Sequence, residues 1–288
     1  MDHHFSPHGR LPAAFTAPKT SSFVQFLMSY APELLPYSPM RKDLDARGKT
    51  ELELEHGTTI VAATFAEGVV MAGDRRATMG NMISKRDVRK VFRTDEYSAA
   101  GMAGVWNIAV EIIRLFQVEL EHYEKMEGRS MSLVGKANRL GTMIRGNLGA
   151  AMQGLVAVPL FVGYDEDTQT ARIFSYDTAG GPTEERQFFA IGSGSIFARS
   201  SLKKLYTDGM TVHDAVLACV QALYDAADDD SATGGPDLAR QIFPVVATVT
   251  ADGFAWVPDG ESEEYGRMVV EQRLRSPDGP KASLVAGQ

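Results

Sequence analysis

His56-Gly57-Thr58-Thr59 places a threonine that could act as a nucleophile in the interior of the chain. A threonine hydroxyl is a poor nucleophile at neutral pH unless a base lies beside it. The α-amino group of Thr58 is one economical base, but it exists only if the Gly57–Thr58 bond is cut. The β-branched and apolar run over residues 58–63 predicts a buried strand, so cleavage would leave the new amine at the end of a rigid element. The alternative is a structural His-Gly turn before an ordinary strand.

Two charged residues downstream could adjust the chemistry of that amine. A nearby cation would lower the pKa of the amine from its reference value of about 7.7–8.0, because a second positive charge is disfavoured. Lys90 is the candidate cation, since alternation over residues 87–92 places Val88 and Lys90 on one face of a predicted strand. A lysine that points inward needs a partner, and Asp74 is the candidate counterion. Taken singly, each charge is more often a solvated surface residue.

Three further segments follow in order: Gly101-Met102-Ala103-Gly104, Gly192-Ser193-Gly194-Ser195 and Asp230-Ser231-Ala232-Thr233-Gly234-Gly235. Together with the Thr58 junction, Gly73-Asp74-Arg75-Arg76 and Lys90, this ordered set resembles the β subunit of the bacterial (actinobacterial-type) proteasome, an N-terminal nucleophile hydrolase. The resemblance covers about residues 56–257. It implies the catalytic subunit of the core particle: a self-activating threonine endopeptidase that degrades unfolded or tagged proteins inside a ring-shaped chamber.

The resemblance also implies roles for individual residues. Thr58 would be the nucleophile, Gly57–Thr58 the bond of autocleavage, and the Gly104 N–H the donor to the oxyanion. The full implied catalytic set is Thr58, Asp74, Lys90, Gly104, Ser193, Asp230 and Thr233. Thr233 stands where many members of the family have a serine, and its hydroxyl can still donate a hydrogen bond. Without the other motifs, Gly104 reads as a glycine that ends a strand before a helix.

The resemblance further implies a pocket for the side chain that precedes the cleaved bond. Ala77, Val88, Met102 and Trp106 would shape this pocket, and Thr78 would pair with the substrate backbone. The four pocket residues are apolar, so we expect a preference for hydrophobic side chains. Trp106 departs from the small residues usual in the family at this point. It either narrows the pocket or turns away into the core.

The implied chemistry needs no cofactor and no metal. The run Asp228-Asp229-Asp230 could suggest a divalent cation site, but it lacks an oxygen-ligand loop of recognisable spacing. A tight polar loop explains the run equally well. The implied partners are α-type subunits, other β subunits in stacked seven-membered rings, a ring-shaped ATPase regulator, and polypeptides tagged with a ubiquitin-like protein.

Two other interpretations remain open. One is the simpler ATP-dependent protease of bacteria that also begins with Thr-Thr and forms six-membered rings. That protein normally lacks a long propeptide and the Asp-Ser-x-Thr-Gly-Gly stretch. The other is a structural ring subunit without catalysis, which would need neither processing at Gly57 nor Lys90.

Composition narrows the class of protein. A hydrophobic content of 44% and a charged content of 23% are ordinary for a globular chain of 288 residues. The formal net charge of −8 argues against a nucleic-acid partner. The one cysteine, Cys219, excludes a disulfide framework, fits a reducing compartment, and falls on the apolar stripe of a predicted helix. No apolar run approaches the roughly 18 residues of a membrane span. The N-terminal residues lack a basic flank followed by an apolar core, so we expect no secretory signal. We therefore expect no membrane partner and a cytoplasmic protein.

The elements that must position these residues begin at Thr58. Residues 1–57 hold six of the 13 prolines and predict an extended arm with one short amphipathic helix around residues 23–30, which we interpret as a propeptide removed by autocleavage. The alternative is a disordered tail. Residues 58–288 form the predicted catalytic domain, with a disordered tail from about residue 277. The predicted strand pairs are 58–65 with 68–73, 90–93 with 97–103, and 242–250 with 254–257, and further strands are 155–164, 171–177 and 186–191.

Four helices complete the pattern, over residues 105–124, 132–152, 196–206 and 211–227. The first should bury one face that includes Ile108, Ile112, Leu115 or Phe116, and Val118 or Glu119. The second contains four glycines, which lower helix propensity by about 1 kcal/mol each relative to alanine. They could permit close helix packing, including packing between subunits; the alternative is an irregular helix. The last should bury Val212, Val216, Cys219 and Leu223. Strand pairs that alternate with helix pairs predict an α+β domain, and the resemblance implies a four-layer αββα sandwich of two stacked antiparallel sheets.

Overall fold

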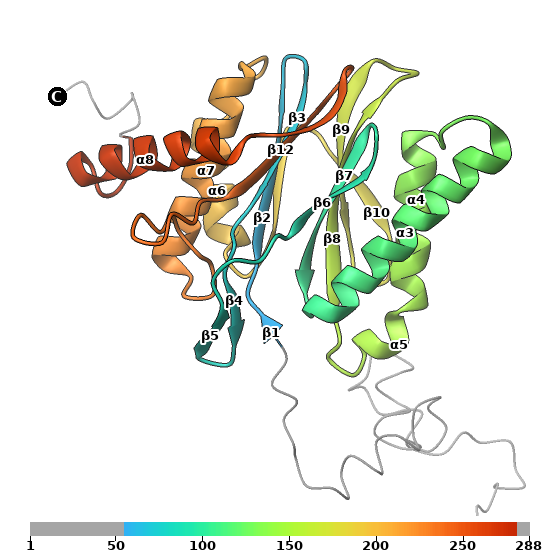
Figure 1. Cartoon of the computed structure of the whole chain (residues 1–288), viewed down its shortest axis with the longest axis horizontal. Helices are drawn as coiled ribbons and strands as arrows, with labels where there is room; N and C mark the ends of the chain where they lie inside the picture. Colours follow the sequence, from blue (N-terminus) through green and yellow to red (C-terminus); the bar gives the residue numbers. More distant parts are fainter. Residues whose placement is uncertain (1–54, 281–288) are drawn as a thin grey trace, which may run out of the picture. The chain divides into compact units, whose positions relative to one another are not determined.

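The computed structural model describes residues 55–280 of the chain. The predicted arm helix and the end of the predicted tail lie outside these residues. Two five-stranded antiparallel sheets form the centre of the described part. Each sheet carries helices on its outer face, so the order of layers is helix, sheet, sheet, helix (Figure 1). The predicted α+β αββα fold is therefore confirmed.

The first sheet positions the Thr58 junction. Its strands lie in the order β11-β2-β3-β12-β13. Their bounds are β2 Thr59–Phe65, β3 Gly68–Gly73, β11 Phe188–Gly192, β12 Val245–Thr250 and β13 Gly253–Trp256. Strands β2 and β3 form the predicted hairpin, with Ile60 opposite Gly73 and Phe65 opposite Gly68. The strand after the junction thus lies inside the sheet, between β11 and β3.

The second sheet has the order β10-β9-β8-β7-β6. Its strands are β6 Val91–Asp95, β7 Ser98–Gly104, β8 Ala157–Asp165, β9 Thr170–Tyr176 and β10 Pro182–Glu185. A small third sheet joins β1 Glu55–His56, β4 Ala77–Met79 and β5 Met82–Lys85 in the order β1-β4-β5. The sequence did not predict β1, β4, β5 or β10, because each is shorter than five residues and lacks an apolar alternation.

Helices cover the outer face of each sheet. Helices α3 Trp106–Glu127 and α4 Leu133–Gly146 pack on the second sheet, and α4 is followed by the short α5 Leu148–Ala151. Helices α6 Ser195–Leu205 and α7 Val212–Asp229 pack on the first sheet, where α8 Asp259–Arg275 contacts α7 and β12. The Thr211 hydroxyl accepts a hydrogen bond from the Asp214 N–H at 3.2 Å, which is the expected cap of α7. Helix α8 was not predicted, since its polar sequence lacks a broad apolar face.

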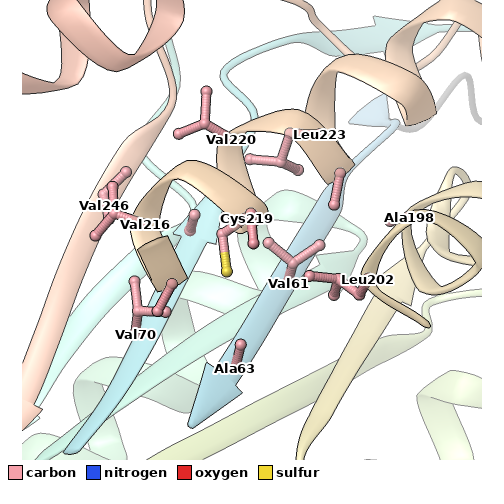
Figure 2. Close-up of a cluster of buried hydrophobic side chains, with 14 of the residues drawn as sticks. Val61, Ala63, Val70, Ala198, Leu202, Val216, Cys219, Val220, Leu223 and Val246 are labelled. Carbon is pink, nitrogen blue, oxygen red and sulfur yellow. The ribbon is translucent and has the colours of Figure 1, made fainter. Parts of the chain in front are cut away.

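Apolar side chains fill three interfaces between the four layers. One cluster lies between the two sheets and includes Ile60, Met71 and Leu160. A second lies between α3, α4 and the second sheet. The third lies between the first sheet and α6 and α7, and Figure 2 shows Cys219 within it beside Val61 and Leu202. Cys219 is fully buried, and burial raises the pKa of its thiol, so its predicted packing role is confirmed.

Several details of the helices differ from the expectation. The buried face of α3 consists of Ala109, Ile112, Ile113, Phe116 and Leu120. Leu115 and Val118 are instead 53% and 62% exposed, because 3.6-residue periodicity rotates them off that face. Val212 lies on the same face of α7 as Val216 and Cys219, but it is the first residue of the helix and is 44% exposed.

Glycine and the chain end account for two further differences. The predicted helix over residues 132–152 divides at Asn147 into α4 and α5. Gly141 within α4 lies against the Gly180 carbonyl, which a β-carbon at residue 141 would approach to 2.4 Å, so this glycine serves a contact inside the chain. Residues 277–280, predicted to be disordered, form a turn in which the Gly279 N–H donates to the Ser276 carbonyl at 3.0 Å.

We expect Leu202→Ala to lower the free energy of unfolding by about 2–5 kcal/mol, since the side chain is fully buried between α6 and the sheet and its loss leaves a cavity. Denaturation in urea, followed by circular dichroism, measures this change. Leu274→Ala is the matched control because Leu274 is 80% exposed, and its effect should stay within about 0.5 kcal/mol. Equal losses in the two variants would contradict the packing described for α6.

Candidate active site

The Gly57–Thr58 bond lies in a two-residue connection between β1 and β2. On one side, His56 pairs with Thr78 and Glu55 pairs with Met79 of β4. On the other side, Thr59 begins the central strand β2. The bond is therefore held at both ends by strand pairing, and the Thr58 side chain is 6% exposed.

Gly57 has a backbone conformation that suits glycine. Its φ is +94°, which residues with a β-carbon rarely adopt. A β-carbon there would also lie 2.5 Å from the Thr78 hydroxyl oxygen and 3.0 Å from the Ala232 carbonyl oxygen. The turn that presents the Gly57 carbonyl to its surroundings thus depends on the absence of a side chain.

Two hydrogen-bond donors meet at the Gly57 carbonyl oxygen. The Thr58 hydroxyl donates to it at 2.6 Å, and the Lys90 ammonium donates to it at 2.8 Å. A hydroxyl and a cation therefore both bind the carbonyl oxygen of the bond for which the sequence analysis predicts cleavage. A cation in this position polarises the carbonyl and favours negative charge on its oxygen.

Lys90 and Asp74 form a buried ion pair, as expected from the sequence. The Lys90 Nζ lies 2.7 Å from Asp74 Oδ1, and the two side chains are 1% and 0% exposed. Lys90 lies immediately before β6 rather than within it, but the Met102 N–H still donates to its carbonyl at 3.2 Å. This contact continues the ladder to β7 and keeps the side chain directed inward, together with Val88.

The Lys90 ammonium has an acceptor for each of its three N–H groups. Besides Gly57 O and Asp74 Oδ1, it donates to the Arg76 carbonyl oxygen. Burial lowers the pKa of Lys90 below its ordinary value, and the adjacent Asp74 carboxylate opposes that shift. The three acceptors match the protonated form of the side chain, so we assign a charged lysine at neutral pH.

Asp74 accepts hydrogen bonds from four separate parts of the chain. Its Oδ1 accepts from Lys90 and from the Thr59 N–H at 2.8 Å. Its Oδ2 accepts from the Arg76 N–H and the Gly234 N–H, each at 2.9 Å. This carboxylate therefore joins the start of β2, its own turn after β3, the segment before β6 and the loop after α7.

Ser193, Asp230 and Thr233 also come together, on the other side of Thr58. The Ser193 N–H donates to the Thr58 carbonyl at 3.0 Å, and its hydroxyl donates to Asp230 Oδ2 at 2.6 Å. The Thr233 hydroxyl donates to the same Oδ2 atom at 2.6 Å. Burial raises the pKa of Asp230, but these two hydroxyls, the Ala232 N–H and the Lys90 charge together hold it below its ordinary value. Helix α7 ends at Asp229. Asp228 and Asp229 therefore belong to the end of the helix, and Asp230 belongs to the loop that follows it.

Thr59 is a member of this network that the sequence analysis missed. Its hydroxyl lies 2.6 Å from the Thr233 hydroxyl and accepts from the Gly194 N–H at 3.0 Å. The residue is fully buried. A signal was present, because a buried strand that begins with two threonines must pair the second hydroxyl as well as the first.

Gly104 ends β7 opposite Ala157 of β8. Its φ is +112°, and a β-carbon there would lie 2.1 Å from the Val156 carbonyl oxygen. The sequence analysis offered two interpretations of this glycine, a donor to an oxyanion and a residue that ends a strand before a helix. In the structure, the backbone conformation and the adjacent strand both exclude a side chain at this position.

The predicted substrate-binding residues divide into two groups. Ala77 and Met102 are buried, at 6% and 2% exposure. Thr78 belongs to β4 and pairs with His56 of β1. Val88 and Trp106 line a pocket of about 490 Å³ between the segment before β6 and helix α3. The Trp106 ring lies 6.1 Å from the Phe92 ring. Trp106 thus lies against the pocket wall, and Phe92 is a lining residue that sequence spacing did not reveal.

No group of three His, Cys, Asp or Glu side chains within residues 55–280 is arranged to hold a metal ion. No helix in the same part of the chain is long and apolar enough to cross a membrane.

The fold is the α+β sandwich of the N-terminal nucleophile type. The family model described as "Proteasome subunit" matches residues 54–237. The chain is 59% identical to the proteasome subunit beta of Streptomyces griseus over 96% of its own length and 97% of that protein. It is 57% identical to the proteasome subunit beta of Streptosporangium roseum over 98% of its length and 99% of that protein. It is 56% identical to the protein of the same name from Acidothermus cellulolyticus, over 96% and 95% of the two chains.

The chain therefore belongs to the proteasome subunit family, and within it the similarity is to β subunits of actinobacteria. The resemblance stated from the sequence motifs is confirmed.

We expect Asp74→Asn to lower the free energy of unfolding by about 3–5 kcal/mol, because it leaves the Lys90 charge buried without its counterion. Urea denaturation measures the loss. Asp237→Asn is the matched control, since Asp237 forms a more exposed ion pair with Arg240 and should change stability far less. A loss as small as that of the control would contradict a tightly coupled buried pair.

Asp230 should contribute a pH-dependent part of the stability. Because its pKa is lower in the folded chain than its ordinary value of 3.8, the stabilisation is present above that value and is lost as pH falls through the folded pKa. We expect the stability difference between the wild type and Asp230→Asn to be largest near about pH 7 and to shrink towards about pH 3. Urea denaturation across this range measures it, with Asp229→Asn as the neighbouring control. If the stability difference between the wild type and Asp230→Asn did not change with pH, it would not come from ionisation of Asp230.

Proposed function

We propose that the chain is the catalytic β subunit of a proteasome core particle, a threonine endopeptidase that activates itself by cutting the Gly57–Thr58 bond. The observation that carries the proposal is the pair of donors at the Gly57 carbonyl oxygen, Thr58 Oγ at 2.6 Å and Lys90 Nζ at 2.8 Å. A purely structural turn needs neither a buried cation nor a nucleophile at that atom, and burial of both has a free-energy cost.

In the first step, Thr58 Oγ attacks the Gly57 carbonyl carbon. The Oγ–C bond forms, the C–N bond to Thr58 breaks, and the hydroxyl proton ends on the Thr58 nitrogen, which becomes an amine. Negative charge on the Gly57 oxygen in the transition state would be stabilised by the Lys90 ammonium. Water then hydrolyses the resulting ester and releases residues 1–57.

In the second reaction, the freed Thr58 amine acts as general base for its own hydroxyl, which attacks a substrate peptide bond. The Gly104 N–H would hold the oxyanion, and water would hydrolyse the acyl-enzyme. Lys90 lowers the pKa of the amine through its charge, and Asp74 holds Lys90 in place. Ser193, Asp230 and Thr233 would order the amine and the attacking water, with the Ser193 N–H already bound to the Thr58 carbonyl.

The region around Thr78 suits a peptide in extended conformation. Glu55 and His56, on the amino side of the cleaved bond, already pair with β4 as an added strand. We infer that a substrate takes this place after the propeptide leaves, with its backbone paired to Thr78. Its side chain before the cut would enter the apolar region formed by Ala77, Val88 and Met102, with Trp106 at its wall.

The partners belong to the same proposal. An endopeptidase needs separation from other proteins, and a chamber of stacked seven-membered β rings, closed by α-type rings and supplied by an ATPase ring, would provide it. Polypeptides tagged with a ubiquitin-like protein would be the substrates. These assignments, the absence of a cofactor and the cytoplasmic location stay predictions from the resemblance.

We expect the wild-type chain, coexpressed with an α-type subunit, to lose residues 1–57, and Thr58→Ala to retain them. Thr58→Ser is the matched control because it keeps the hydroxyl, and it should also be processed. Intact-mass spectrometry distinguishes the two forms directly. An unprocessed wild type in assembled particles would instead favour a structural ring subunit.

We also predict that assembled particles cleave after large apolar side chains at least about tenfold faster, as kcat/KM, than after lysine or glutamate, because Ala77, Val88 and Met102 offer no group that could pair with a charge. A panel of peptides that differ only at this residue measures the ratio. Trp106→Ala should shift the preference towards larger side chains, since it removes part of the pocket wall. A preference for lysine or for acidic residues would overturn the assignment of the pocket.

A further inference from the structure

A small cavity lies beside the turn that contains Asp74, and Arg75 and Arg76 of that turn line it. Its volume is about 20 Å³, which is room for one water molecule or one monatomic ion. Its walls come from the turn after β3, the end of β5, the loop after α7 and the segment before β12. The lining side chains that matter are Arg75, Arg76, Arg86 and Asp237, with backbone from Gly234 and Gly235.

The charge around this cavity is positive, although the whole chain has a formal charge of −8. Three guanidinium groups line it, and the one lining carboxylate, Asp237, is already paired with Arg240 at 2.9 Å. Arg75 is paired with Asp87, and Arg76 donates to the Ser231 carbonyl at 3.1 Å. Arg86 has no ion-pair partner within residues 55–280. A single negative charge would therefore be attracted to this position.

One of the residues that line the cavity, Arg75, has a donor without an acceptor. The Nε of Arg75 is buried and makes no hydrogen bond within the described part of the chain. A buried guanidinium N–H without an acceptor is costly, and such groups in folded proteins are usually satisfied by an ordered water or an ion. An anion would satisfy the N–H and also gain the attraction of the three guanidinium charges, which a neutral water does not.

We propose that this cavity binds one small monovalent anion of the size of chloride. The anion would lie between the two loops that hold Asp74, because Arg76 and Gly234 each donate a backbone N–H to that carboxylate at 2.9 Å. It would thus fasten the turn after β3 to the loop after α7. This binding does not depend on the proposed protease activity.

Bromide in place of chloride tests the proposal, because bromide gives an anomalous X-ray signal. Crystals of the full-length Thr58→Ala chain, soaked in sodium bromide, should show an anomalous peak within hydrogen-bond distance of Arg75. In solution, thermal unfolding of the same chain should shift upwards and saturate with sodium chloride, relative to sodium gluconate at equal ionic strength. Arg86→Gln should raise the half-saturating chloride concentration by at least about tenfold, as expected for loss of a charged partner.

Arg267→Gln is the matched control, since Arg267 forms a surface ion pair with Glu263 outside the cavity and should leave the chloride response unchanged. Arg86 is exposed, so its substitution leaves the fold intact where Arg75→Gln disturbs a partly buried ion pair. A water without anomalous signal in the cavity, or equal unfolding temperatures in chloride and gluconate, would overturn the proposal. A chloride response that survives in Arg86→Gln would also overturn it, because the guanidinium cluster would then not be the site.

Discussion

The candidate site depends on one buried ion pair, between Lys90 and Asp74. Taking two charges out of water costs several kcal/mol for each ion, and mutual attraction offsets this only where further hydrogen bonds complete the shells of both groups. Here both shells are complete. Lys90 has three acceptors, two of which are backbone carbonyls, and Asp74 has four donors, three of which are backbone N–H groups. Most of the hydrogen bonds that stabilise the two buried charges therefore come from backbone groups of the site.

This arrangement explains why so much of the site consists of turns and strand ends. A backbone group can bind a buried charge only where it is not used by a sheet or helix. Gly57, Arg76 and Gly234 lie where regular pairing stops, so their carbonyl or N–H groups are free to bind Lys90 or Asp74. The sandwich supplies rigidity, because β2 lies inside its sheet and apolar side chains pack on both of its faces. Rigid strands that end in polar turns thus place the Thr58 hydroxyl within a hydrogen bond of its own preceding carbonyl.

Much of this could be predicted from the sequence, and the rest could not for physical reasons. The long elements carried clear periodicity, as for β2, β3 and α7, and the glycines and charges of the site stood at recognisable spacing. The short strands β4 and β5 carried none, because their pairing comes from contacts with other segments rather than from their own residues. The buried face of α3 was predicted in part: Ile112 and Phe116, the alternative to Leu115, are buried, whereas Leu115 and Val118 are exposed. Apolar residues on two faces of a helix do not reveal which face is covered. The role of Thr59 as a partner of Thr233 required the three-dimensional approach of residues 174 positions apart.

The residues that donate hydrogen bonds to Asp74 lie far apart in the sequence, and this affects the order in which the site forms during synthesis. Asp74 is made early, but one of its donors, Gly234, leaves the ribosome about 160 residues later. Until that loop has folded back, the carboxylate lacks part of its shell and the Lys90 position is not fixed at the Gly57 carbonyl. If the Gly57–Thr58 bond is cut as proposed, a nascent chain would carry this bond before the residues around it are in place. The proposed cleavage would then follow completion of the domain.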